Sequence, residues 1–322
     1  MPRPTIVSYA QNREDVVLWR ALVTTAGVEH GTYVEVGAND PTEFSISRTF
    51  YDHGWSGVTI EPVAEFAARH RDQRPRDRVV QAAVTDADVA EIALHVVDDT
   101  GLSTLVDDVS ARHTTAGWSP HDVTVPAARL DAVLAEAGLE GRDIHFLMVD
   151  VEGAESAVIA SVDLDRWRPW VLVVEATAPL DSRPTHHDWE PTVLAAGYEF
   201  CLFDGLSRFY VAREHSAALK DALGYPACPH DDYVSVDLVV AREERDAAEA
   251  RWSASVEDAV HWRTIALTGW ADALARTRPH SAPVDDGARR ELEAMRRTLS
   301  WRVTRPLRSA RGVLSRARRV LR

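Results

Sequence analysis

Four acidic residues lie at or near the ends of apolar runs of strand length. They are Glu35 in TYVEVG, Glu61 in GVTIE, Asp150 in HFLMVD and Glu175 in WVLVVE. In an open parallel α/β sheet the carboxyl ends of the strands meet at one edge, where ligands bind. Carboxylates at that edge can hold a cation, accept hydrogen bonds from a diol, or take a proton as general bases. The sequence therefore predicts a binding and proton-transfer site at this edge.

The first strand is followed by the turn Glu35-Val36-Gly37-Ala38-Asn39-Asp40, which has one glycine. A dinucleotide site uses three glycines, so that backbone N–H groups can approach a pyrophosphate. S-adenosylmethionine has no phosphate; it carries a sulfonium, an ammonium and a ribose diol. Glu35, Gly37 and Asn39 suit that ligand better than a dinucleotide. The alternative is that the turn is only a strand end followed by a helix cap.

Glu61 follows the first turn by roughly 25 residues, near the spacing expected of a ribose-binding acid. Its position after a wholly apolar strand favours a ribose contact over an ordinary surface acid. The third predicted strand ends in Ala83 and Val84, whose small side chains and backbone groups lie where an adenine would bind.

Apolar runs alternate with segments of helical period up to about residue 200, which is typical of an α/β fold with a mostly parallel sheet. Strands are predicted at 32–37, 57–61, 78–84, 145–150 and 170–175, and helices at 12–24, 44–53, 64–71, 130–137, 154–161 and 189–196. Residues 91–110 indicate an insertion of short strands and loops. Two further strands flank Asp204-Gly205, a strong hairpin signal. We expect a Rossmann-like, mostly parallel sheet that ends in an antiparallel hairpin.

Four stretches together resemble the FkbM family of S-adenosylmethionine-dependent methyltransferases: SYAQNREDVVLWRAL, YVEVGANDPTEFSISRTFYDHGWSGVTIEP, FLMVDVEGAE and YEFCLFDGLSRFYVAREH. The resemblance covers residues 7 to about 236. It implies a class I methyltransferase fold and O-methylation, typically of sugar or polyketide hydroxyls.

The resemblance also implies roles for single residues. The family's glycine turn corresponds to Glu35, Gly37 and Asn39, its ribose acid to Glu61, and its acidic motif after the fourth strand to Asp150, Glu152, Gly153 and Glu155. Ser207 departs from the pattern, because the subgroup usually reads DGLNRFY. Because serine has no amide group, a side-chain amide role that the family pattern would imply is not expected at this position.

Methyl transfer to a hydroxyl needs a base, because the hydroxyl loses its proton as the new bond forms; such a base adds about 10² to 10⁴ in rate. The candidates are Asp150, Glu152, Glu175, His186 and His187. We favour Asp150 and His187, with Glu175 on the neighbouring strand end as a third catalytic candidate. Glu152 and Glu155 can instead cap the helix that follows, since acids in a first turn are stabilised by the helix dipole. We expect capping for Glu155.

Three further residues are candidates for the ligand edge. Gln11 and Asp15 lie one turn apart on a predicted helix and can close over the cofactor, although a capping role fits equally well. Ser103, in the insertion, can touch cofactor or acceptor. A Mg²⁺ ion could be held by the carboxylates of Asp150, Glu175 and Asp188, but nothing in their spacing requires one, so no metal ligand is assigned.

Composition limits the class of protein. The chain has 322 residues, of which 45% are hydrophobic and 27% charged. No apolar run approaches the roughly 18 to 20 residues that span a bilayer. The first residues, MPRPTIVSYAQNRED, lack the apolar segment of a secretory signal, so we expect a cytoplasmic protein. Cys201 and Cys228 are too few for a disulfide framework or a zinc site.

The charge is unevenly distributed. The net charge is −14, but residues 296–322 contain ten arginines and no acid, so residues 1–295 carry −24. Such a body repels nucleic-acid phosphates. We expect a methyltransferase domain at 1–238, a helical extension and linker at 239–300 and a basic amphipathic tail at 301–322. The tail can contact an anionic inner-membrane surface or a partner protein, or fold back on the acidic body. The oligomeric state stays open.

Three functions are compatible with these features. The first is an S-adenosylmethionine-dependent O-methyltransferase whose acceptor is a sugar hydroxyl of a glycan or glycosylated metabolite. The second is a catalytically silent Rossmann-like module in a glycan-assembly complex, which the acids at the strand ends argue against. The third is a nucleotide-dependent oxidoreductase, which the missing glycines disfavour.

Overall fold

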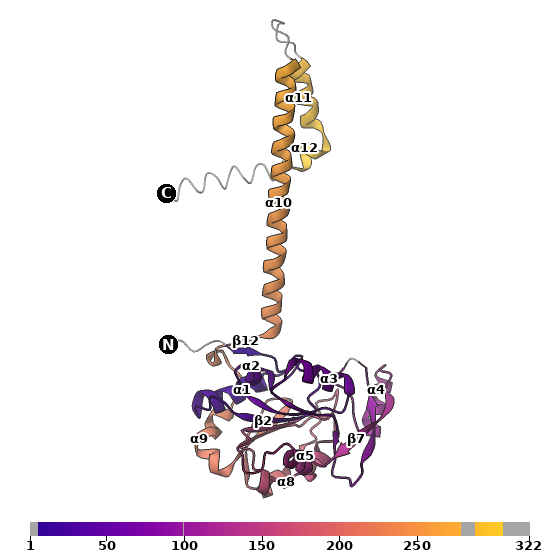
Figure 1. Cartoon of the computed structure of the whole chain (residues 1–322), viewed down its shortest axis with the longest axis vertical. Helices are drawn as coiled ribbons and strands as arrows, with labels where there is room; N and C mark the ends of the chain where they lie inside the picture. The colour runs from indigo at the N-terminus through magenta and orange to yellow at the C-terminus, as the bar shows by residue number, and fades with distance from the viewer. Residues whose placement is uncertain (1–5, 99, 278–286, 305–322) are drawn as a thin grey trace. The chain divides into compact units, whose positions relative to one another are not determined.

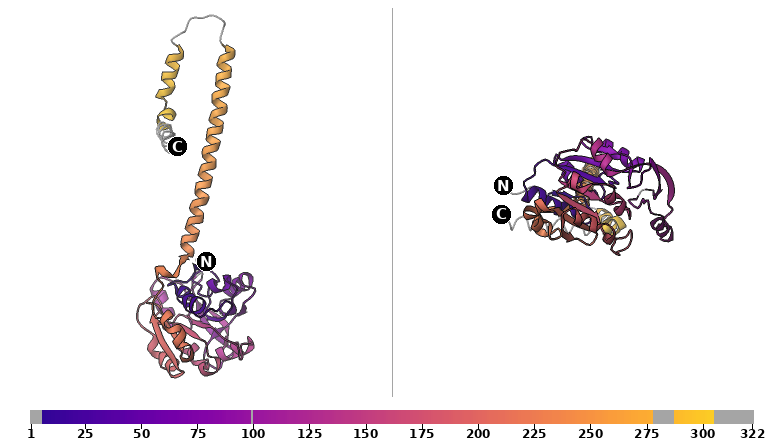
Figure 2. Two further views of the ribbon diagram at one scale, coloured as in Figure 1. Left: turned by 90° about the vertical axis from the view of Figure 1, so that its left-hand side faces the viewer. Right: turned by 90° about the horizontal axis from the view of Figure 1, so that it is seen from below.

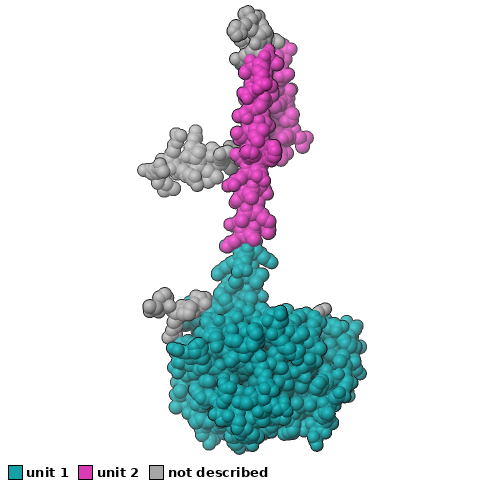
Figure 3. Space-filling view, in the orientation of Figure 1, with its two compact units in different colours: residues 1–245 teal, residues 246–322 magenta. Residues whose placement is uncertain are grey.

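The structure is a computed structural model that describes residues 6–98, 100–277 and 287–304 (Figure 1). The chain forms two compact units, residues 1–245 and 246–322 (Figure 3). The border between them falls inside helix α10 (Val236–Thr277). The expected domain boundary at residue 238 lies near the start of this helix. Figure 2 shows α10 as one uninterrupted helix.

Unit 1 is built on a seven-stranded sheet. The strand order is β10 (Tyr198–Phe203), β11 (Ser207–Ala212), β9 (Val171–Glu175), β8 (Phe146–Val149), β2 (Thr32–Val36), β3 (Ser56–Ile60) and β4 (Arg78–Val80). The five strands from β9 to β4 are parallel, whereas β11 runs antiparallel to both β9 and β10. The predicted fold class, a Rossmann-like class I methyltransferase sheet with an antiparallel C-terminal hairpin, is confirmed.

Helices cover both faces of this sheet, because alternate strand residues point to opposite sides. Val34 and Leu147 pack on one side with α5 (Leu130–Glu136), α6 (Glu155–Ala160) and α8 (Glu190–Ala195). Tyr33 and Phe146 pack on the other with α1 (Glu14–Trp19), α2 (Arg48–Asp52) and α9 (Arg213–Leu223). Figure 1 shows α1 and α2 on one side of β2 and α5 on the other. Glu35 points to the same face of the sheet as Tyr33, so its side chain meets partners from that face.

The third predicted strand is corrected by the structure. Residues 78–84 do not form one strand: β4 ends at Val80, and β5 (Ala83–Val84) pairs with Ala127 and Ala128 of β7 (His121–Ala128). The insertion is also more regular than expected. It forms a small sheet in the order β5, β7 and β6 (Glu91–Val96), together with helix α4 (Asp107–Thr115). The pairing with β7 draws the chain out of the central sheet after Val80.

The N-terminal helix predicted at 12–24 consists of α1 and a π-helical turn, η1 (Arg20–Thr25). Before it, β1 (Ile6–Ser8) pairs in parallel with β12 (Tyr233–Ser235), a pairing that the sequence analysis did not predict. The helix expected at 44–53 is shorter, because α2 begins at Arg48. The remaining elements of unit 1 are α3 (Ala64–Gln73), α7 (Leu164–Trp167), η2 (His186–Asp188) and η3 (Pro229–Asp231).

Unit 2 contains most of α10, α11 (Gly287–Arg297) and α12 (Leu299–Val303). Thr304 is the C-cap residue of α12. It follows α12, and the N-cap of that helix is Thr298, whose hydroxyl accepts from the Trp301 N–H. The rest of the expected basic tail, 305–322, lies outside the described residues. Among the described helices, none has an apolar stretch long enough to cross a bilayer.

Candidate functional site

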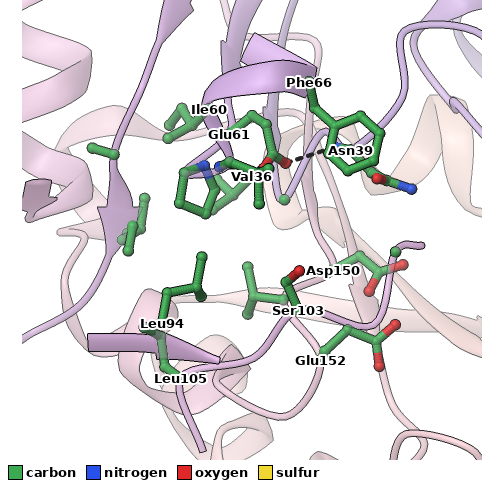
Figure 4. Close-up of a pocket in the computed structure, with 18 of the residues that line it drawn as sticks. Val36, Asn39, Ile60, Glu61, Phe66, Leu94, Ser103, Leu105, Asp150 and Glu152 are labelled. Carbon is green, nitrogen blue, oxygen red and sulfur yellow. Dashed lines mark hydrogen bonds between the residues drawn. The ribbon is translucent and has the colours of Figure 1, made fainter. Parts of the chain in front are cut away.

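Two adjoining cavities lie at the carboxyl ends of the parallel strands. The inner cavity is enclosed by the ends of β2, β3 and β5 and by the insertion, with Glu61, Phe66 and Ser103 in its wall (Figure 4). The outer cavity has a volume of about 740 Å³ and reaches from Gln11 to Leu180. The two share seven wall residues, namely Gly37, Asn39, Phe66, Thr100, Gly101, Asp150 and Glu152. Together they make one site of two compartments.

The turn after β2 is in close contact with the ends of the neighbouring strands β3 and β8. Gly37 has a φ of +80°, and a Cβ atom there would lie 1.7 Å from the carbonyl oxygen of Asp150. The N–H groups of Gly37 and Ala38 donate to the carbonyl of Ile60 at 3.0 and 3.1 Å. Only glycine satisfies both the backbone conformation and the close approach. The turn therefore brings the end of β2 against the end of β8.

Glu61 holds this turn from the neighbouring strand. Its carboxylate accepts the N–H of Asn39 at 2.8 Å and the N–H of Val63 at 2.7 Å. Figure 4 shows the Asn39 bond and places Glu61 across the inner cavity from Asp150 and Glu152. Burial raises the pKa of Glu61 to about 7. A carboxylate has about four acceptor positions, so two remain for hydroxyls of a ligand.

Glu35 lies in the wall of the outer cavity, but its carboxylate is already engaged by the protein. It accepts a hydrogen bond from the Ser47 hydroxyl and lies 3.8 Å from the guanidinium of Arg74. Burial raises the pKa of Glu35, while Arg74 and Ser47 oppose that shift. Arg74 is itself fully buried and also binds Ser45 and the Pro41 carbonyl. Glu35 thus anchors the segment 41–47 to the sheet.

Asp150 and Glu175 face each other at the ends of adjacent strands. Val149 pairs with Val174, so the next residue on each strand becomes a neighbour of the other. Their carboxyl groups influence one another electrostatically, and the Oε2 atom of Glu175 is buried with no hydrogen-bond partner among the described residues. Burial raises the pKa of both, that of Asp150 to about 6, and the Asp150 charge drives the pKa of Glu175 further, to about 12. Glu175 therefore holds the proton of the pair, and Asp150 ionises first.

Two more acids adjoin this pair. Glu152 has a left-handed φ of 53° and lines both cavities, and its carbonyl accepts the Thr104 hydroxyl at 2.7 Å. Burial, and then the charge of Asp150, raise its pKa to about 9. Glu155 accepts the N–H groups of Val151 and Gly153 at 3.2 and 3.0 Å, in the first turn of α6. Glu155 therefore lies in the first turn of α6, as expected, but it binds the turn before the helix, whose N-cap residue Ala154 makes no side-chain cap hydrogen bond.

The insertion closes the inner cavity. Ala83 and Val84 line it, as does Ser103, whose buried hydroxyl has no hydrogen-bond partner in the described part of the chain. Gly101 lies close to the first turn, since a Cβ on it would come within 2.9 Å of the Asn39 amide nitrogen. An apolar wall with one free hydroxyl is suited to a planar heterocycle.

Gln11 and Asp15, the two candidates from the N-terminal segment, do not both reach the site. Gln11 lines the outer cavity. Asp15 does not; it is buried and accepts the hydroxyls of Ser8 and Thr49, and therefore holds the N-terminal segment rather than a cofactor.

The predicted catalytic role of His187 and the predicted Mg²⁺ ligand Asp188 both belong to the segment after β9. His187 lies exposed on η2 with its ring 4.0 Å from that of His186, and it lines neither cavity. Asp188 is likewise exposed, away from Asp150 and Glu175. Within the described residues, no three His, Cys, Asp or Glu side chains are arranged to hold a metal ion.

Several wall residues were not singled out from the sequence. Phe66 borders both cavities from the first turn of α3, and Leu94 and Leu105 reach the inner cavity from the insertion. Phe44 and Leu180 stand on the wall of the outer cavity. An apolar residue on a helix or strand has the same periodicity whether it faces the core or a ligand, so the sequence carries no signal that separates the two.

Comparison with known proteins places these residues in a family. The model of the methyltransferase FkbM domain matches residues 35–200, just over half of the chain and all four acids at the strand ends. No curated protein matches the chain.

Solved structures that are similar to the chain include three methyltransferases. Magnesium protoporphyrin IX methyltransferase (ChlM) from Synechocystis PCC 6803, with bound SAM, has a TM-score of 0.34 at 10% identity, over 61% of this chain and 77% of that one. A TehB-like SAM-dependent methyltransferase from Corynebacterium glutamicum has a TM-score of 0.33 at 10% identity, over 60% and 86%. CalO1, a methyltransferase of calicheamicin biosynthesis in its SAH-bound form, has a TM-score of 0.28 at 16% identity, over 61% and 54%.

Proposed function

Because the chain belongs to the FkbM family of methyltransferases, we propose that it transfers the methyl group of S-adenosylmethionine to a sugar hydroxyl of a glycan or glycosylated metabolite. One observation carries the proposal. Gly37, Asn39 and Glu61 form one side of a two-compartment site whose other side contains the carboxyl pair of Asp150 and Glu175. The proposed cofactor turn and the proposed proton acceptor thus face the same two-compartment site.

The inner cavity fits the adenosine part of the cofactor. Val84, Leu94 and Phe66 offer apolar surface for an adenine, and the free hydroxyl of Ser103 offers a hydrogen bond. The unused lone pairs of Glu61 suit a ribose diol. S-adenosylmethionine, when bound, supplies a methyl carbon that its sulfonium makes electrophilic. The protein's task is then to hold a hydroxyl oxygen in line with that carbon.

Asp150 is the proposed proton acceptor. With a pKa of about 6 it is largely ionised at neutral pH, while its neighbour Glu175 is protonated. In the transfer, the hydroxyl oxygen would bond to the methyl carbon while the carbon–sulfur bond breaks and S-adenosylhomocysteine leaves, and the carboxylate of Asp150 would take the hydroxyl proton. Glu175 lies beside that carboxylate, at the end of the neighbouring strand. His187 is left out of the proposed site, because it lines neither cavity.

The outer cavity is suited to the acceptor. Its volume of about 740 Å³ lies within the range of small-molecule sites, roughly 300 to 1,000 Å³. Polar groups of Thr177, Asp181 and Glu43 line it, alongside the apolar side chains of Phe44 and Leu180. A sugar presents hydroxyls and an apolar ring face together, which supports a carbohydrate acceptor. No metal ion is included in the proposal.

Thermal shift tests the cofactor. A ligand at 100 times its dissociation constant adds about 2.7 kcal/mol to the free energy of unfolding. We expect S-adenosylhomocysteine, and not NAD, to raise the melting temperature. No rise with either would contradict the proposal and favour a silent module. An acceptor screen with labelled S-adenosylmethionine and mass detection then identifies the hydroxyl that gains the methyl group.

A further inference from the structure

Left-handed backbone at residues other than glycine gathers at the outer cavity. Among the described residues, seven such positions occur, namely Arg13, Asn39, Phe44, Glu152, Arg168, Leu180 and Asp232. Four of them line the outer cavity. Only two of the seven are apolar, Phe44 with φ 57° and Leu180 with φ 58°, and both are among those four. Asparagine and glycine take this conformation readily, whereas bulky apolar side chains take it at a cost.

The fold does not compensate this cost by burying the two side chains. Phe44 is 56% exposed and Leu180 is 61% exposed, and neither belongs to a core cluster of unit 1. The turns around them are held by polar groups instead. Asp40 accepts the N–H groups of Thr42 and Glu43 before Phe44, and the Ala178 carbonyl accepts the N–H of Asp181 after Leu180.

Strain of this kind is found where surrounding structure holds a residue for a binding role. The two apolar side chains stand on the wall of the cavity that also contains Asp150 and Glu175, the proposed reaction centre. They come from segments far apart in the chain, the one before α2 and the one after β9. A ligand whose hydroxyl reaches Asp150 therefore extends its remaining part past them.

We propose that Phe44 and Leu180 bind an uncharged apolar group on the acceptor, so that the acceptor is a neutral glycoside with a hydrocarbon or aromatic aglycone. This inference rests on the proposed function. The aglycone is uncharged because Glu43 and Asp181 lie beside the two apolar residues in the same wall and would repel an anionic group. Among the described residues of this wall the one arginine is Arg69, which is paired with Asp40 and Glu65.

Two glucosides test the inference on the full chain saturated with S-adenosylhomocysteine. Octyl β-D-glucoside, below its micelle concentration, and methyl β-D-glucoside differ only in the apolar group, and their dissociation constants are measured by saturation-transfer NMR. We expect the octyl compound to bind at least about tenfold more tightly, from partial burial of its methylene groups. Phe44→Asn and Leu180→Asn each reduce that ratio, and the double variant removes it.

The same variants separate a binding role from a structural one. Asparagine accommodates the left-handed backbone, so both substitutions leave the melting temperature unchanged or raise it. Val89→Asn is the matched control: Val89 is 46% exposed but lines neither cavity, so its substitution changes neither dissociation constant.

Three results overturn the inference. The first is equal binding of the two glucosides by the unmodified protein, including no binding of either. The second is a ratio of the two dissociation constants that stays the same in the double variant. The third is a fall in melting temperature for both single variants, which would show that the side chains stabilise the fold. Binding of S-adenosylhomocysteine is read separately by calorimetry. Its absence contradicts the proposed function, whereas its presence without the octyl preference contradicts only this inference.

Discussion

The carbonyl oxygen of Asp150 lies against the Cα atom of Gly37, where a Cβ would approach it to 1.7 Å. Two strand ends are thereby joined without any side chain between them. The first turn, which Glu61 holds through Asn39, and the carboxyl pair after β8 and β9 become parts of one site. Five variants, each read beside a control or a partner variant, and a truncation test what this arrangement implies.

Gly37→Ala is expected to abolish binding of S-adenosylhomocysteine and to lower stability, because the new methyl group meets main chain that cannot move aside. Gly138→Ala is the control. Gly138 has a similar φ of +72° but no atom within 4 Å of the position of a Cβ. It should cost only the left-handed strain, about 1 to 2 kcal/mol, and leave binding intact. Chemical denaturation measures the stability of each variant, and calorimetry measures its binding of S-adenosylhomocysteine. Equal effects of the two variants would contradict the steric argument.

Glu61→Gln is expected to weaken S-adenosylhomocysteine binding by about 10- to 100-fold, the range for losing hydrogen bonds to a charged group. The amide NH₂ also cannot accept the N–H of Asn39 or Val63. Glu65→Gln changes an exposed acid on α3 that lines neither cavity, and should leave the dissociation constant unchanged. An unaltered dissociation constant in Glu61→Gln would remove Glu61 from the site.

The acid pair predicts a pH profile for methylation of an acceptor found in the screen. The base must be ionised, so kcat should rise with pH through about 6, the pKa to which burial raises Asp150. Asp150→Asn is expected to lower kcat by about 10² to 10⁴. Glu175→Gln resembles the protonated form that Glu175 already has, and should keep most of the activity. A larger loss in Glu175→Gln than in Asp150→Asn would reverse their roles.

Buried acids also predict how stability depends on pH. Burial raises the pKa of Glu61 and Glu155 to about 7 and of Glu152 to about 9, from an ordinary value of 4.5. Each binds its proton more tightly in the folded state, so its contribution is complete below pH 4.5 and is lost as the pH rises to the folded pKa. The free energy of unfolding from urea titrations should therefore decrease from pH 5 to pH 8.

The glutamine of Glu152→Gln cannot ionise, so this variant should make that decrease smaller, by up to about 4 kcal/mol over the three pH units. Glu140→Gln, which changes an exposed acid paired with Arg166, should leave the slope as it is. A stability that rises over this interval would contradict the raised pKa values.

Truncation after Asp286 is expected to leave the fold and S-adenosylhomocysteine binding unchanged. All residues that line the two cavities lie between Gln11 and Leu206, within unit 1, which has its own core clusters. Circular dichroism and calorimetry on the shortened chain test this. Loss of binding would show that the removed segment supports the site.

The sequence alone determined the central strands β2, β3, β8 and β9, their direction, the antiparallel hairpin and the acids at the strand ends. Apolar runs of strand length alternate with helical periods, and this local pattern requires a parallel sheet with its carboxyl ends at one edge. From that rule Glu61, Asp150 and Glu175 could be assigned to one edge, together with the first turn at Gly37. The adjacency of Asp150 and Glu175 follows from strand ends that are neighbours in the sheet.

Only the tertiary structure decided which polar groups are free for a ligand. Glu35 and Asp15 have the residue types of a site, yet Ser47 and Thr49, which lie far from them in the chain, engage both carboxylates. His187 is exposed and lines neither cavity, although residues 177–181 of the same loop line the outer one. Such partners are non-local, and hydrophobic periodicity records only the local environment of each residue. The wall formed by the insertion, and the strain at Phe44 and Leu180, depend on contacts of the same non-local kind.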